Sequence, residues 1–371
     1  MRPSRVLEHG DEVSALLLSP NGDYLATASY DSPARIWETA TGREVARVRD
    51  VRRIALSANG KLLATASEDQ TAAIWDALSG RQVRTLGQGD DVVDMAFSRD
   101  GTLLATASYN QKSARVWDLE TGQELARLVH DRAVGGVLFD SDARHVITRP
   151  GGATQGPVLV WESRTGELVQ QLAHDNRPVQ DFALSPDGAR LATSAADKVR
   201  IYTVGQWDKV ITAESPTSKS ALAFSTDGQK LAAGGQGRLG SVEIISPSTG
   251  EMKRLAVHKG AVRFVAFTLD ARHVVSVHQG QTASVWETDG GGELMRVWTS
   301  DQAHNSRAPA AFSPDGRLLI AIGESSVNYW PLFPADLVEE ACHRLTRNLT
   351  HAEWKAFLPG ERYRKTCPSL P

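Results

Sequence analysis

The sequence is poor in the features that mark several protein classes. Its 371 residues include two cysteines, too few for a disulfide-stapled scaffold or a four-cysteine zinc site. No run approaches 18 apolar residues, and residues 1–8 hold no apolar leader core, so we expect neither a membrane-spanning helix nor a secretory signal. With 41 basic and 44 acidic residues, the chain has no basic excess for nucleic acid or anionic lipid. We therefore predict a cytoplasmic protein without nucleic-acid or membrane partners.

Common catalytic motifs are also missing. There is no Gly-x-x-x-x-Gly-Lys-Ser/Thr loop, no His-Glu-x-x-His and no Gly-x-Ser-x-Gly. Five of the ten histidines recur at equivalent places of a repeat, which favours a structural role over a metal site or a catalytic triad. We accordingly expect no enzymatic activity, no cofactor and no bound metal.

What the sequence does contain is a repeat. A turn resembling Ser-Pro-Asp-Gly occurs eight times, with spacings of 38 to 45 residues. Its copies are residues 19–22, 57–60, 98–101, 140–143, 185–188, 225–228, 268–271 and 313–316. In each unit a short apolar run enters this turn, where Asn/Asp-Gly supplies the positive φ of a tight hairpin. A second run follows, a third usually ends on an aromatic residue, and most units then have a Thr/Ser-Gly turn and a fourth run. Four short strands at this period predict one propeller blade per unit.

At these residues the chain resembles the WD40 family, and in particular the tandem arrays common in bacteria. The family's blade hallmark is a Ser-x-Asp turn with a Trp six residues after the Asp, and a His before the next blade. In the family these four side chains form a hydrogen-bonded tetrad. The resemblance implies tetrad roles for His9, Ser29, Asp31, Trp37, Ser67, Asp69, Trp75, Ser108, Asn110 and Trp117. The fourth and sixth units depart from the pattern, so we expect packing to hold those blades more than tetrads do.

The ends of the repeat suggest how the ring closes. The eighth unit lacks a fourth run of its own, and residues 4–9 match the fourth runs of other units. We therefore predict an all-β propeller of eight four-stranded blades over residues 1–331, closed by the N-terminal strand; seven blades is the alternative. Residues 332–371 change to a helical pattern and are expected to form a short tail packed on the propeller. Cys342 and Cys367 both lie in this tail, either as a disulfide or as two reduced thiols.

Function should lie where the blades differ. In a propeller, two kinds of residue point at the rim of the central channel. They are the residues that open the first strand and those between Ser and Asp in the turn from the second to the third strand. These positions hold Arg52, Arg53, Asp94, Asp181, Arg263, Phe264, Tyr30, Glu68 and Tyr109, which include residue types enriched at interface hot spots. An ordinary solvated rim is the alternative interpretation.

The leading hypothesis is a non-enzymatic module that binds a protein or peptide. By resemblance it would be the sensor or scaffold of a bacterial signalling or defence protein, whose effector domain is lost from this chain or encoded apart from it. The alternative is a propeller enzyme with an active site at the channel mouth, since the fold alone does not decide function.

Overall fold

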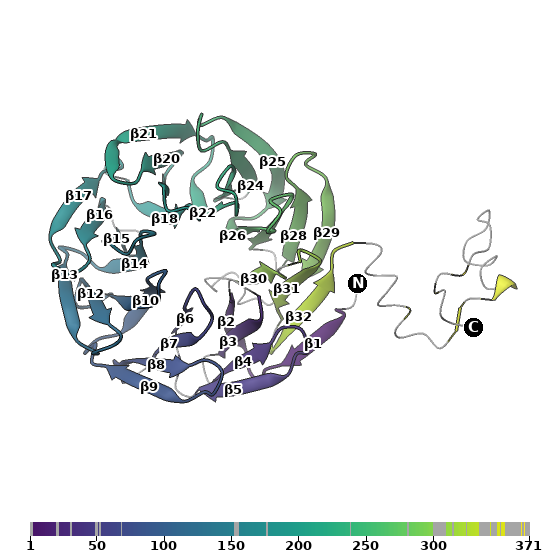
Figure 1. The fold of residues 1–371 in the computed structure, drawn as a ribbon. Coiled ribbons are helices and arrows are strands. Elements are labelled where there is room, and N and C mark those ends of the chain that lie inside the picture. Colours follow the sequence, from purple (N-terminus) through teal and green to yellow (C-terminus); the bar gives the residue numbers. More distant parts are fainter. Residues whose placement is uncertain are drawn as a thin grey trace.

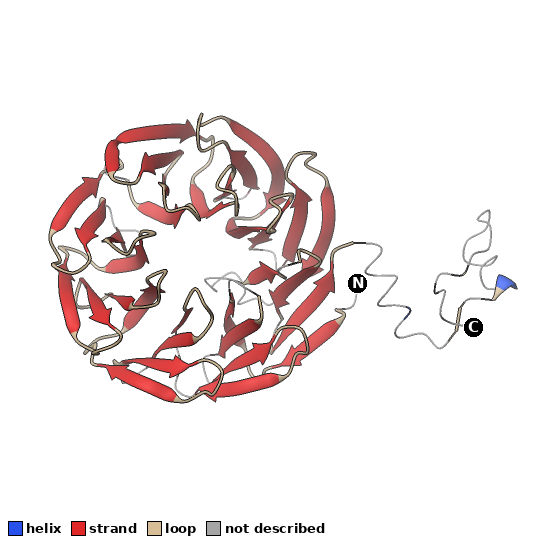
Figure 2. Ribbon diagram, viewed as in Figure 1, coloured by secondary structure: helices blue, strands red, loops and turns tan. Residues whose placement is uncertain are grey.

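The structure is a computed structural model. It describes residues 3–19, 22–29, 32–48, 51, 53–67, 69–151, 156–175, 177–237, 239–279, 282–299, 309–313, 315–323, 325–333, 342, 347–348, 350–352, 365 and 367. Within them the chain forms 32 strands in eight four-stranded antiparallel sheets, arranged as blades around a central channel (Figures 1 and 2). This confirms the predicted eight-bladed propeller.

The strands occupy four concentric positions, one strand of each blade at each position. In blade order, the inner strands are β2 (Val13–Leu18), β6 (Arg53–Leu56), β10 (Val92–Phe97), β14 (Val134–Phe139), β18 (Val179–Leu184), β22 (Lys219–Phe224), β26 (Val262–Phe267) and β30 (Ala310–Phe312). The second strands are β3 (Tyr24–Ser29), β7 (Leu62–Ala66), β11 (Leu103–Ser108), β15 (His145–Pro150), β19 (Arg190–Ala195), β23 (Leu231–Gly235), β27 (His273–His278) and β31 (Leu318–Ile322).

The third strands are β4 (Ala34–Glu38), β8 (Ala72–Asp76), β12 (Ser113–Asp118), β16 (Val158–Glu162), β20 (Lys198–Thr203), β24 (Leu239–Ile245), β28 (Thr282–Glu287) and β32 (Ser326–Pro331). The outer strands are β5 (Glu44–Val48), β9 (Gln82–Leu86), β13 (Glu124–Val129), β17 (Leu168–Leu172), β21 (Gln206–Glu214), β25 (Met252–Lys259), β29 (Glu293–Trp298) and β1 (Arg5–Glu8). We call the face with the second-to-third turns and the blade-to-blade connections the top face, and the opposite face the bottom face.

The first-to-second turns are built as the repeat predicts. In blade 3 the hydroxyl of Ser98 donates to Oδ1 of Asp100 at 2.5 Å, and Oγ of Ser98 accepts the backbone N–H of Leu103 at 2.9 Å. Gly101 follows with φ of +74°, a conformation in which a side chain would be strained. The same Ser–Asp contact recurs in blades 5, 6 and 8.

The ring closes through the N-terminal strand. β1 pairs antiparallel with β32, with Arg5 opposite Tyr329 and Leu7 opposite Val327. The first strand therefore completes the last blade, as the sequence predicts. Hydrophobic side chains fill the spaces between neighbouring blades, and the core cluster at the seam joins Leu7 to Trp37 and Tyr329.

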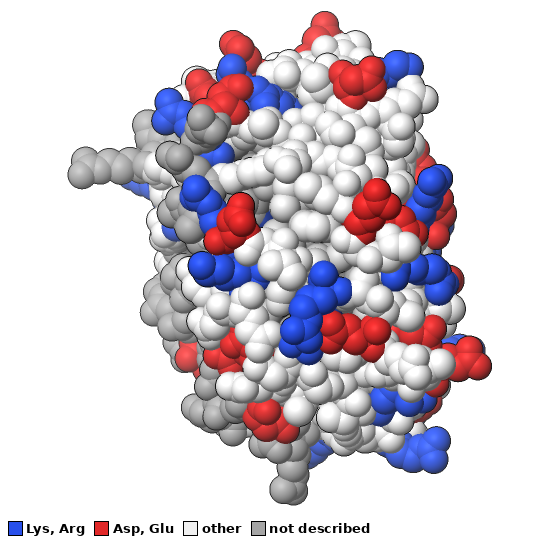
Figure 3. Space-filling model, turned by 90° about the vertical axis from the view of Figure 1, so that its left-hand side faces the viewer, with Lys and Arg blue, Asp and Glu red and all other residues white. Residues whose placement is uncertain are grey.

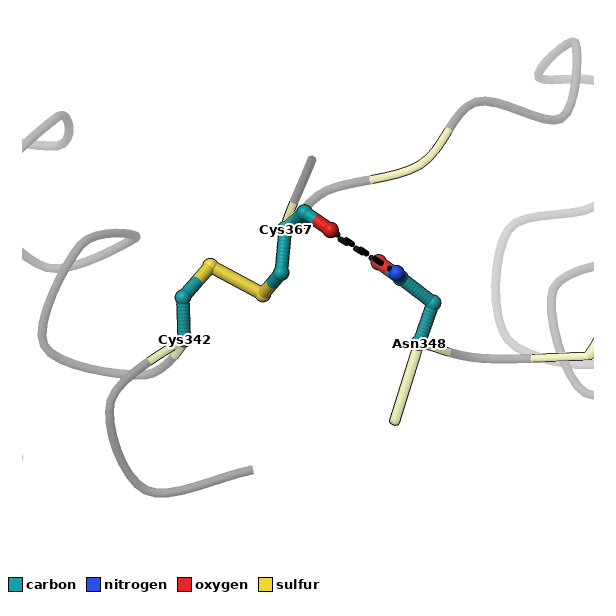
Figure 4. The surroundings of a disulfide bond; sticks show 3 residues. All are labelled: Cys342, Asn348 and Cys367. Carbon is teal, nitrogen blue, oxygen red and sulfur yellow. Dashed lines mark hydrogen bonds between the residues drawn. A yellow bond between two sulfur atoms is a disulfide. The ribbon is translucent and has the colours of Figure 1, made fainter. Parts of the chain in front are cut away.

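Most of the tail lies outside the described residues, so its helical pattern and its packing on the propeller stay predictions. The structure joins Cys342 and Cys367 in a disulfide, with the two Cα atoms 5.3 Å apart. The side-chain amide of Asn348 donates to the carbonyl of Cys367 and accepts its N–H, both at 2.9 Å (Figure 4). Of the two alternatives for these cysteines, the structure shows the disulfide.

Candidate functional site

The rim of the channel on the top face is formed by one equivalent residue of each blade, three positions before the last residue of the inner strand. A β-bulge precedes this position in most blades, as between Val92 and Asp94 of β10. From blade 1 to blade 8 the position holds Ala15, Arg53, Asp94, Gly136, Asp181, Ala221, Phe264 and Pro309. The charge and size of the side chain at this position therefore change from one blade to the next.

Asp94 and Asp181 join blades to one another. Oδ2 of Asp94, which is buried, accepts the backbone N–H of Val137 in the next blade at 3.0 Å. Oδ2 of Asp181 accepts the N–H of Leu222 in the same way at 2.8 Å. Each carboxylate thus satisfies a backbone donor of the neighbouring inner strand. This geometry assigns the two acids a structural role in addition to their place on the rim.

Arg149 lies beside Asp181, although its position in β15 gave no sequence signal of a site. Its guanidinium carbon is 5.7 Å from the ring centre of Phe182, within cation–π range. Gly136 stands opposite Arg149 and leaves room for it, because a Cβ at Gly136 would lie 2.8 Å from Nε of Arg149. Burial raises the pKa of Asp181 to about 6, and the charge of Arg149 opposes that shift.

Of the other predicted rim residues that the structure describes, Arg53, Arg263 and Tyr109 are open to solvent. The guanidinium of Arg53 donates through Nε to the carbonyl of Val93 at 3.2 Å and stays exposed, and Arg263 is exposed as well. Tyr109 is 45% exposed, and Phe264 is half-buried. Arg52, Tyr30 and Glu68 lie outside the described residues. The exposed side chains among these residues are therefore two arginines and a tyrosine, from blades 2, 7 and 3.

A second set of side chains recurs inside the blades. The indole N–H of Trp37, Trp75 and Trp117 donates to the hydroxyl of Thr27, Thr65 and Thr106, at 2.8 to 2.9 Å. The predicted partners Ser29, Ser67 and Ser108 are wrong for this contact. Each lies two residues beyond the threonine, on the same face of the second strand but nearer its top end.

The serines and acids belong to a separate network. In blade 3 the hydroxyl of Ser108 donates to Asp90, and the amide of Asn110 donates to the same carboxylate at 3.2 Å. In blade 1 Ser29 donates to Asp11 at 3.4 Å. Asp69 instead accepts two bonds from its own turn residue Thr71. Asp31 lies outside the described residues.

The blade-to-blade histidines complete the indole network in several blades. Nε2 of His130 is 2.8 Å from the hydroxyl of Thr148, which also accepts the indole N–H of Trp161. Blade 4, which we expected packing to hold more than a tetrad, thus has the histidine, the hydroxyl and the indole of this network. In blade 3 Gln88 takes the histidine's place and accepts from Thr106 at 2.7 Å. Burial is the main cause that lowers the pKa of His9, His130, His174 and His258 to about 4, so these imidazoles are neutral near pH 7.

Comparison with known protein families agrees with the propeller fold. The WD domain, G-beta repeat family matches residues 1–38, and the lipoprotein LpqB beta-propeller domain family matches residues 49–223. The chain is a WD40-repeat β-propeller.

The WD40 chain is similar to parts of larger proteins. Apoptotic protease-activating factor 1 of Rattus norvegicus is 26% identical over 206 residues, which cover 52% of this chain and 16% of that protein. An uncharacterized WD repeat-containing protein of Synechocystis sp. is 28% identical over 180 residues, 46% of this chain and 50% of that one. The crystal structure of the computationally designed Ika8 protein superposes with a TM-score of 0.73 at 19% identity, covering 89% of this chain and all of that chain, which shows the fold alone.

In blade 6 of the WD40 propeller, which has no indole, a buried ion pair occupies the top of the blade. Nζ of Lys219 is 2.8 Å from Oε2 of Glu243, and both side chains are at most 1% exposed. Hydroxyls surround the pair: Ser215 and Ser241 donate to Glu243, while Thr217 and Ser241 accept from Lys219. We expected packing to hold this blade more than a tetrad does, and we did not foresee the ion pair. The sequence does contain a signal of this pair. Lys219 is the first residue of β22, whereas β2, β10, β14, β18 and β26 begin with valine.

Neither a membrane helix nor a metal cluster occurs in the described part of the WD40 chain. No helix there is long and apolar enough to cross a bilayer. No group of three or more His, Cys, Asp or Glu side chains in that part is placed to hold a metal ion.

Proposed function

We propose that this WD40 propeller is a non-enzymatic scaffold or sensor that binds a protein or peptide on its top face, around the channel mouth. WD40 propellers are typically protein-interaction modules, which supports the general role. The observation that carries the proposal is the exposure of Arg53, Arg263 and Tyr109 around the channel mouth, with the half-buried Phe264 next to Arg263. Arg and Tyr are the residue types that dominate interface hot spots.

The chemistry of this group favours a segment with acidic side chains. Within the described residues neither Arg53 nor Arg263 is paired with a carboxylate, whereas the acids of the same rim position, Asp94 and Asp181, accept backbone N–H groups. A guanidinium can bind a carboxylate with two parallel hydrogen bonds. Phe264 and Tyr109 add apolar area beside the charges.

We further propose that the propeller serves a bacterial signalling or defence protein and works beside an effector domain. The similarity to a Synechocystis protein supports the bacterial part. The similarity to 16% of Apoptotic protease-activating factor 1 supports a module that acts next to other parts.

The test is capture of partners from a bacterial lysate by the intact chain and by the variant Arg53→Ala/Tyr109→Ala/Arg263→Ala. We expect a protein that the intact chain retains and the variant loses. The matched control is Leu78→Ala/Arg81→Ala/Arg164→Ala, which removes exposed side chains from the bottom-face turns and should retain the partner. A photo-crosslinking residue in place of Tyr109 should label the same protein. Equal capture by both variants would show that the site lies elsewhere.

A further inference from the structure

The outer strands of a propeller are edge strands, and seven of the eight carry charged residues. An edge strand presents unpaired backbone N–H and C=O groups, and charged side chains keep other strands from pairing with them. The charges are Arg5 and Glu8 of β1, Glu44 and Arg47 of β5, Arg84 of β9, Glu124 and Arg127 of β13, Asp208, Lys209 and Glu214 of β21, Lys253, Arg254 and Lys259 of β25, and Glu293 and Arg296 of β29. β17, with the sequence Leu-Val-Gln-Gln-Leu, has none.

In β17, uncharged residues occupy the two positions that hold an ion pair in other outer strands. In β5, β13 and β29 a glutamate and an arginine three residues apart form a salt bridge along the edge, at 2.9 Å in β13 and 2.8 Å in β29. Glu124 lies opposite Trp117 of the third strand, and Leu168 of β17 lies opposite the equivalent Trp161. Leu168 and Gln171 therefore stand where the other strands have the glutamate and the arginine.

The next blade covers β17 less than it covers other outer strands, although Val204 and Trp207 of blade 5 pack against the core cluster that includes Leu172. The third-to-fourth turn usually reaches back over the preceding outer strand. A Cβ at Gly80 would lie 2.9 Å from Cβ of Ala46 in β5, and one at Gly166 would lie 3.3 Å from Cβ of Ala126 in β13. Blade 5 has a shorter turn, in which Thr203 pairs with Gln206 across Val204 and Gly205, and a Cβ at Gly205 would meet nothing within 4 Å.

As a result the edge of β17 is open to solvent. Leu168 and Val169 are 40% and 44% exposed, and Gln170 and Gln171 are exposed as well. Positions equivalent to Gln170 hold Ala46, Ala126 and Met295, all buried. Figure 3 views the molecule from the side where β13 and β17 lie, and its upper half shows an area free of Lys, Arg, Asp and Glu.

We propose that β17 pairs with β17 of a second copy of this chain, in antiparallel register centred on Gln170. Leu168 then lies opposite Leu172 of the partner, Val169 opposite Gln171, and Gln170 opposite Gln170. A two-fold axis places identical residues against one another, and a strand without charges tolerates this arrangement. Because β17 is the single outer strand without charged residues among the described strands, pairing ends at a dimer.

The interface is small, and that sets the strength of the dimer. One pair of five-residue strands buries less than the roughly 800 Å² per partner of a standard interface, so we expect a dissociation constant of about micromolar order. The convex side of the propeller limits further contact. This surface is separate from the channel mouth, so the dimer proposal does not depend on the proposed peptide site.

The first experiment is sedimentation equilibrium of the intact chain from about 1 to 200 µM, a range that spans micromolar affinity. The average mass should rise from that of one chain toward that of two. Leu168→Glu/Gln171→Arg installs the ion pair found in three other blades and should keep the protein monomeric with an unchanged melting curve. The matched control Gln82→Glu/Thr85→Arg adds the same pair to β9 and should leave the dimer intact.

A charge-swap experiment tests the register. Gln170→Lys and Gln170→Glu each place like charges opposite one another at the two-fold axis, so each variant alone should be monomeric at low salt. An equimolar mixture should recover the dimer, because Lys then faces Glu. A monomeric intact chain at every concentration, or a dimer that the β17 changes leave untouched, would overturn the proposal. Failure of the mixture to associate would overturn the register and with it the strand pairing.

Discussion

Lys219 and Glu243 show how one exchange can change the chemistry of a whole blade. The pair sits at the top of blade 6, with both side chains almost without solvent contact. Burial lowers the pKa of Lys219, and the charge and hydrogen bond of Glu243 oppose that effect. Gly235 makes the arrangement possible, because a Cβ there would lie 2.7 Å from the hydroxyl of Ser241. The lysine, the glutamate and the surrounding hydroxyls form a mutually dependent set.

This dependence gives a prediction at the scale of single residues. Lys219→Val restores the valine of other inner strands but leaves the buried Glu243 with only the half-exposed Arg254, whose Nε is 3.6 Å from Oε1 of Glu243, as a cationic partner. This loss should cost about 3–5 kcal/mol of unfolding free energy. The double change Lys219→Val/Glu243→Leu removes both charges and should cost much less, about 1 kcal/mol. Urea unfolding followed by tryptophan fluorescence measures both. If the double variant is as unstable as the single one, the loss of stability does not come from breaking the Lys219–Glu243 pair.

At the scale of strands and turns, the sequence allowed the order and type of nearly every element to be predicted. Apolar runs and Asn/Asp-Gly turns act locally, so their meaning does not depend on the rest of the chain. The indole partner was misassigned because Thr27 and Ser29 both carry hydroxyls on one face of β3, and alternation alone cannot choose between them. The bonds of Asp94 and Asp181 cross to residues 43 and 41 positions away, so no local pattern could reveal them.

The histidine network predicts how these elements respond to acid. The imidazoles of His9, His130, His174 and His258 have a pKa of about 4 in the folded chain, against 6.5 for the free side chain. Since the unfolded chain binds protons first, the stability present above pH 6.5 is lost progressively as the pH falls toward 4. Each histidine should cost about 2 kcal/mol by pH 5.

Blade 3 supplies the variant that tests this response. Gln88 replaces histidine there and still accepts from Thr106, so His130→Gln should keep a hydrogen bond to Thr148. We expect a melting temperature close to that of the intact chain at pH 7.5 and a smaller loss between pH 7.5 and 5, measured by circular dichroism. Identical pH profiles for the two proteins would rule out His130 as a source of the acid sensitivity.

For the whole molecule, the decisive feature is a ring made of eight similar parts and closed by one strand. Each blade packs against two neighbours, so the structure has no natural end except at the seam between blades 8 and 1. There β1 pairs with β32, and Leu7 packs in the cluster that also holds Trp37 and Tyr329. Closure removes two exposed edges and links the first residues of the chain to its last strand.

Deletion of residues 1–8 should therefore act on the entire ring. It leaves β32 as an unpaired edge and opens the cluster around Tyr329, so the melting temperature should fall by several degrees and self-association should increase. Adding back a peptide of residues 1–9 should recover part of the loss, because the peptide can supply β1 in its native register. Changing Val6, an exposed residue of β1, to Thr is a control that should have little effect. An unchanged melting curve after the deletion would mean that blade 8 does not need its fourth strand, and that the ring is held by packing between blades alone.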